Sequence, residues 1–133
     1  MTTTGNPNEG LTAALDARFE GKTLTLYLTS GLTYTATTIA ADAVTASVES
    51  AAITPGASTI NASGEAELDL SFVINGGVGG VTYDGYAFVL NDGVTSHLVC
   101  FVDFEGVSRN IFAAEDRTFY YKPKQSSSVV YAG

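Results

Sequence analysis

The chain has 133 residues, a length typical of one domain with one hydrophobic core. It carries 14 acidic and 6 basic residues, a formal net charge of −8 and an isoelectric point near 4.3. Such a chain lacks the positive surface that nucleic acid and anionic membranes require, so neither is expected as a partner. Residues 1–6 have neither the positive charge nor the apolar run of a signal peptide. Cys100 is the single cysteine, which excludes an internal disulfide.

The charges are unevenly distributed along the chain. The 86 residues between Lys22 and Arg109 contain no Lys or Arg, but they contain nine acids. The carboxyl-terminal part holds four bases, Arg109, Arg117, Lys122 and Lys124. Ordinary solubility is the favoured explanation of this pattern, and the alternative is protein–protein assembly, in which the acidic face and the basic end contact different surfaces.

The first predicted element is a short amphipathic helix over about residues 7–20. Asn6 is placed to cap it, Pro7 suits the first helical position and Glu9 suits a capping box. Gly21 marks its end. The spacing of three large apolar residues predicts a stripe that packs on a sheet, or alternatively a docking helix for a neighbouring subunit: Leu11, Leu15 and Phe19.

From Lys22 onward the apolar period changes to two, which is typical of half-buried strands. Residues 24–28 and 32–36 alternate in this way around the Ser30-Gly31 turn and predict a hairpin. Residues 43–53 predict a weaker strand, although their alanines also suit a helix.

Residues 65–74 give the clearest strand pattern. Glu65, Glu67 and Asp69 lie on one side of it, and five apolar residues lie on the other: Ala66, Leu68, Leu70, Phe72 and Ile74. Slippage by one residue would bury the carboxylates, so the orientation is strongly specified.

The second half of the chain predicts further strands. The glycine-rich residues 76–80 form a loop, residues 81–90 and 94–104 flank an Asn-Asp-Gly hairpin turn, and residues 107–113 and 117–122 follow. The predicted fold is mainly β, an antiparallel β-sandwich or jelly-roll-like single domain over residues 1–124. A Ser-rich tail, residues 125–133, ends in Val129, Val130 and Tyr131; it either stays disordered or pairs with a neighbouring chain's sheet edge.

Groups capable of catalysis are scarce. His97 and Cys100 lie three apart on one strand, which predicts opposite faces, and Cys100 is in phase with the core residues. The glycine run lacks the third glycine of a dinucleotide loop, and a strand follows it. Paired carboxylates suggest calcium or glycoside chemistry as a less favoured alternative to a solvated acidic face. We therefore expect no enzyme, no metal and no cofactor.

Three stretches carry a resemblance to a known family: "GKTLTLYLTSG", "LSFVINGGVGGVTYDGYAFVLNDGVTSHLVCFVDFEG" and "RTFYYKPK". Together with the amino-terminal helix, they resemble small virion proteins of tailed bacteriophages, described as tail-fibre-like or capsid-decorating. The resemblance runs from Asn8 to Lys124, without the middle segment from Ile39 to Ser63. It implies no enzyme and no cofactor.

The expected function is that of a non-enzymatic virion protein, assembled in the host cytoplasm, that decorates or cements the capsid. Its expected partners are copies of itself, as a dimer or trimer, and the major capsid protein or tail proteins. The alternatives are a tail, neck or fibre component, and a small carbohydrate-binding β-sandwich. The expected interface residues are Glu65, Glu67, Asp69, Arg109, Arg117, Lys122, Lys124, Val129, Val130 and Tyr131.

Overall fold

A computed structural model describes residues 5–126. The protein is mainly β, with antiparallel sheets and a helix near the amino terminus, which confirms the predicted fold class. The chain forms two compact units. Among the described residues, the helix unit comprises residues 5–21, 55–70 and 120–126, and the sheet unit comprises Lys22–Thr54 and Ser71–Phe119. In the described part, neither helix is long and apolar enough to cross a membrane.

The helix unit combines α1 (Asn8–Phe19) with a small antiparallel sheet. The sheet has the order β11-β4-β3, formed by Lys124–Gln125, Ala66–Glu67 and Thr59–Ile60. The predicted apolar stripe of α1 is buried: Leu11, Leu15 and Phe19. The Phe19 ring meets the Tyr121 ring edge-on, with centroids 6.2 Å apart.

The ends of α1 differ in how well the sequence predicted them. Pro7, with extended backbone, takes the N-cap position that was predicted for Asn6, and no side chain caps the helix there. The Pro7 carbonyl accepts the N–H groups of Gly10 and Leu11 instead. The predicted end is confirmed, because Gly21 follows the helix with a φ of 73°.

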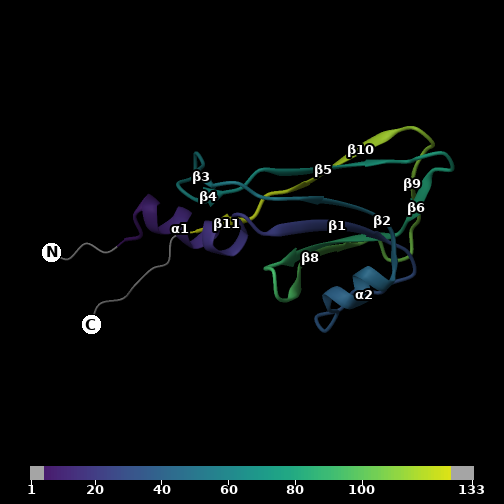
Figure 1. The fold of residues 1–133 in the computed structure, drawn as a ribbon, viewed down its shortest axis with the longest axis horizontal. Coiled ribbons are helices and arrows are strands. Elements are labelled where there is room, and N and C mark those ends of the chain that lie inside the picture. The colour runs from purple at the N-terminus through teal and green to yellow at the C-terminus, as the bar shows by residue number, and fades with distance from the viewer. Residues whose placement is uncertain (1–4, 127–133) are drawn as a thin grey trace. The chain divides into compact units, whose positions relative to one another are not determined.

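The sheet unit is built on a four-stranded antiparallel sheet (Figure 1). Its order is β2 (Ser47–Ile53), β1 (Thr23–Thr29), β7 (Gly85–Asn91) and β8 (Ser96–Asp103). The hairpin predicted between β7 and β8 is confirmed.

Both faces of this sheet are covered. On one face lie the paired strands β5 (Leu70–Asn75) and β10 (Asp116–Tyr121), together with the pair β6 (Val81–Tyr83) and β9 (Arg109–Ile111). Aromatic side chains link the layers, with centroids 5.3 Å apart for Phe72 and Phe88 and 5.1 Å apart for Phe119 and Tyr86. On the other face, α2 (Ala40–Thr45) packs its alanines on β7.

The predicted strand over residues 32–36 is wrong. This segment has no regular structure, and β1 pairs with β2 and β7 instead. The segment is held by its contacts: the Tyr34 hydroxyl lies 2.7 Å from the Thr29 Oγ1, and the Asp84 carboxylate accepts the Gly31 N–H. Tyr34 is buried although it lies in a loop, and this is why the sequence alternates here as it would in a strand.

Three other predicted strands differ in extent. Residues 43–53 begin within α2, where alanine favours the helix, and only then form β2. The strand over residues 65–74 is interrupted between β4 and β5, because the Leu68 N–H bonds to the Pro123 carbonyl. Its predicted alternation is nevertheless confirmed, with the apolar side buried throughout. Residues 81–90 divide at Asp84, whose N–H bonds to the Thr29 carbonyl.

The glycine-rich loop between β5 and β6 packs closely against the turn after β9. The Gly76 N–H donates to the Glu115 carbonyl, and the Ala114 N–H donates to the Gly77 carbonyl, each at 2.8 Å. A Cβ on Gly76 would overlap the Phe112 carbonyl and lie 2.9 Å from that of Ile111. Only glycine permits this approach.

We therefore expect Gly76→Ala to lower the free energy of unfolding by about 3 kcal/mol, because backbone atoms must move to admit the methyl group. Urea-induced unfolding measures the change. Gly79→Ala is the matched control, since a Cβ there meets nothing within 4 Å and φ is not positive. Equal stability of the two variants would contradict the close approach.

Tyr34→Phe tests the anchoring of the loop over residues 32–38. Thr29 is fully buried and its hydroxyl bonds to the Tyr34 hydroxyl. Removal of the Tyr34 hydroxyl therefore leaves the buried Thr29 hydroxyl without that partner. The expected loss is about 1–3 kcal/mol in thermal unfolding. Tyr27→Phe removes a tyrosine hydroxyl elsewhere on the same face and should lower the stability less. A larger loss of stability in Tyr27→Phe than in Tyr34→Phe would refute the anchoring role.

Candidate functional site

The acidic strand side and the basic chain end meet within the helix unit. Lys124 on β11 pairs in register with Glu67 on β4, with Nζ 3.6 Å from Oε2. Lys122 Nζ lies 3.8 Å from Asp69 Oδ1. These ion pairs are partly exposed and contribute little to stability. The structure therefore brings together side chains that the sequence analysis assigned to two separate contact surfaces.

Asn61 organises the two glutamates of this cluster. Its Nδ2 donates to Glu67 Oε2 at 2.9 Å and to Glu65 Oε1 at 3.4 Å. Ser126 Oγ donates to the other Glu65 oxygen at 2.7 Å. The Asn61 amide lowers the pKa of Glu67, and the Ser126 hydroxyl followed by Asn61 lowers the pKa of Glu65. The ionised carboxylates of Glu65 and Glu67 therefore stabilise the fold at a pH above the ordinary glutamate pKa. This stabilisation is lost as the pH falls through the lowered pKa values of the two groups.

The two predicted arginines belong to the sheet unit. Arg109 stacks over the Phe104 ring, with Cζ 4.0 Å from the centroid. Arg117 donates from Nη1 to the Tyr83 hydroxyl at 3.2 Å, and its Nη2 lies 3.5 Å from a Glu115 oxygen. The Tyr83 contact raises the pKa of Arg117. Both side chains thus have structural contacts within their own unit. The remaining predicted interface residues, Val129, Val130 and Tyr131, lie outside the described residues.

A cavity of about 530 Å³ in the sheet unit has three carboxylates on its lining, from Asp84, Asp103 and Glu105. Two of them are engaged in holding backbone. Asp84 accepts the Gly31 N–H, and Asp103 accepts the Tyr34 N–H at 3.2 Å and the Glu105 N–H at 2.8 Å. Within residues 5–126, no group of three or more His, Cys, Asp or Glu side chains is arranged to hold a metal ion. Asp84 and Asp103 therefore fix the loops at this end of the unit.

A bulge in β8 overturns the predicted opposite faces of His97 and Cys100. The register pairs Leu90 with His97 and Phe88 with Cys100, which leaves Val99 as the extra residue. Because Phe88 and Leu90 lie two apart on β7, they share a face of the sheet. His97 and Cys100 therefore share that face as well.

The shared face does not pair these two side chains. His97 Nε2 instead lies 3.0 Å from Thr95 Oγ1 and 3.9 Å from Asp92 Oδ2. Cys100 is half-buried, and its burial raises the pKa of the thiol. A thiol with a raised pKa is a weak nucleophile, which agrees with its interpretation as a small apolar side chain.

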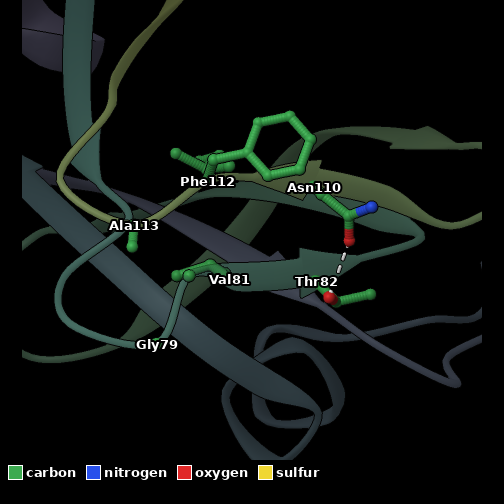
Figure 2. A pocket seen from close by; sticks show the side chains of 8 residues that line it. Gly79, Val81, Thr82, Asn110, Phe112 and Ala113 are labelled. Carbon is green, nitrogen blue, oxygen red and sulfur yellow. Dashed lines mark hydrogen bonds between the residues drawn. The ribbon is translucent and has the colours of Figure 1, made fainter.

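The sequence analysis did not identify the surface beside the glycine-rich loop. A shallow hollow of about 220 Å³ lies between residues 79–82 and 110–113, and Figure 2 shows the side chains that line it. Thr82 donates to Asn110 there at 2.7 Å. Phe112, which lines the hollow, is 67% exposed, and the neighbouring Val78 is fully exposed. The signal in the sequence was Val78 itself, an apolar residue between two glycine pairs.

Comparison with family models, curated proteins and solved structures finds no match to this chain.

The Asn61 cluster gives a titration experiment. Asn61→Asp keeps the side-chain oxygen that accepts the Ser63 and Glu65 N–H groups, but replaces the amide donor by a charge. We expect the pKa of Glu67 to rise to its ordinary value or above, as measured by NMR titration of the side-chain carboxyls. Asn110→Asp makes the same charge change in the sheet unit and is the control. An unchanged Glu67 titration would contradict the role of Asn61.

Proposed function

We propose that this protein is a non-enzymatic structural component of a bacteriophage virion, a decoration or cement protein that associates with itself and with the capsid. The resemblance to small virion proteins, over residues 8–124 without the segment from Ile39 to Ser63, supports this function. The observation that carries it is the engagement of several ionisable side chains in the fold itself. Asp84 and Asp103 hold loops, Glu67 pairs with Lys124, and Arg117 holds Tyr83.

Exposed apolar side chains support assembly. Nine large ones in the sheet unit are each at least 40% exposed: Ile39, Val44, Val48, Val73, Val78, Val94, Phe101, Val107 and Phe112. They lie in α2 and the residue before it, on β2, β5 and β8, and in loops. Exposed apolar residues of this kind suit the contact surfaces of a shell, where neighbours cover them.

Purified particles of the phage that encodes the chain provide the test. We expect the protein on the capsid exterior in electron-microscopy maps, with on the order of hundreds of copies per particle by quantitative mass spectrometry, because a symmetric shell repeats its contacts. A few to dozens of copies at the tail or neck would replace decoration by a tail function. Absence from the particles, together with glycan binding on an array, would favour the carbohydrate-binding alternative and overturn the proposal.

A further inference from the structure

Strand β8 is a long sheet edge with an open outer side. It has eight residues and pairs with β7 on one side, while within residues 5–126 no strand pairs with its other side. Sheet proteins usually protect such edges with lysine, proline or an inward charge, because the outer N–H and C=O groups can bind another strand. β8 contains no Lys, Arg or Pro, and of the protective features it has only the bulge at Val99 and the terminal Asp103.

The opposite edge of the same sheet differs. Its strand β2 carries an exposed charge near its centre, Glu49, and β6 contacts it. Both features discourage the addition of a further strand. Of the two edges, β8 is therefore the one suited to binding an extended segment.

A groove accompanies the β8 edge. It has a volume of about 360 Å³, with an apolar side formed by residues 98–101 and a second side formed by Thr35, Ala36 and Thr38. Phe101 is 40% exposed although it stacks on Tyr34, with centroids 4.8 Å apart. The groove thus offers apolar surface beside two hydroxyl groups, a combination that suits aliphatic and tyrosine side chains.

The chain itself supplies a segment with this chemistry. Seven residues follow Ser126, and they contain the run Val129-Val130-Tyr131, all good strand formers. Residues 125–133 have no charged side chain. By contrast, β2 carries Glu49, and Asp69 directly precedes β5. For copies with a net charge of −8, an uncharged segment makes contact with the least repulsion.

We propose that Val129–Tyr131 of a second copy adds as a strand to the outer edge of β8. This inference rests on the self-association in the proposed function and names its contact. Main-chain hydrogen bonds bind the segment, and the alternation of a strand directs Val129 and Tyr131 together into the groove while Val130 faces away. Donor and acceptor surfaces differ, so two copies that exchange tails form a closed dimer, and more copies form a larger ring or an open chain.

Sedimentation velocity on full-length variants tests the contact. Val99→Lys places a charge on the edge, and Val94→Lys is its matched control, since Val94 is 90% exposed in the β7–β8 turn. For the tail, Val129→Ser/Tyr131→Ser is compared with Val130→Ser. We expect wild type and both controls to form oligomers, and the edge and tail variants to associate about tenfold more weakly or worse.

Mixing the two defective variants gives the decisive result. Each keeps one intact surface, so an equimolar mixture should form a heterodimer that neither variant forms alone. Circular dichroism checks the fold, and Ala36→Arg, which fills the groove from outside the sheet, replaces Val99→Lys if that variant unfolds.

Wild type that sediments as a monomer, unchanged association of the tail variant, or a mixture that stays monomeric would overturn the contact. A monomeric chain that is still found on particles would leave the proposed function standing, so the two failures are distinguishable.

Discussion

The sheet unit depends on β7 being buried on both of its faces. One face packs against the aromatic side chains of β5 and β10, and the other receives α2 and Tyr34. The second face is possible only because β7 presents small residues there. A Cβ on Gly85 would lie 2.9 Å from the Tyr34 ring, and Ala87 is fully buried under the same cluster. Small side chains on one strand thus allow a loop and a helix to replace a third layer of strands.

The contacts of the acidic side chains follow from this arrangement. A chain with irregular segments must satisfy many backbone N–H groups outside helices and sheets, and carboxylates are strong acceptors for them. Asp103 accepts two backbone N–H groups and Asp92 accepts those of Val94 and Thr95, which lowers the pKa of Asp92. Many of the acids that make the chain strongly negative therefore serve loops and turns.

The sequence predicted elements where one local pattern decided the outcome. Alternation placed Phe72 in the core, the Asn-Asp-Gly turn fixed the β7–β8 hairpin, and Gly21 ended α1. It failed where a distant partner competed with the local pattern. Residues 32–36 alternate like a strand, but the nearest available edges of β1 are taken by β2 and β7. The bulge at Val99 is equally invisible in the sequence, and it alone decides which face His97 and Cys100 share.

By itself, the sequence determined the antiparallel β class, the apolar stripe of α1 and the sidedness of the acidic strand, because each follows from a period within a few residues. Only the tertiary structure decided that this acidic strand meets the basic end of its own chain, through the pairing of β4 with β11. The charge separation read along the chain is therefore partly cancelled in space. Strand pairing joins residues more than fifty positions apart, and no local pattern carries that information.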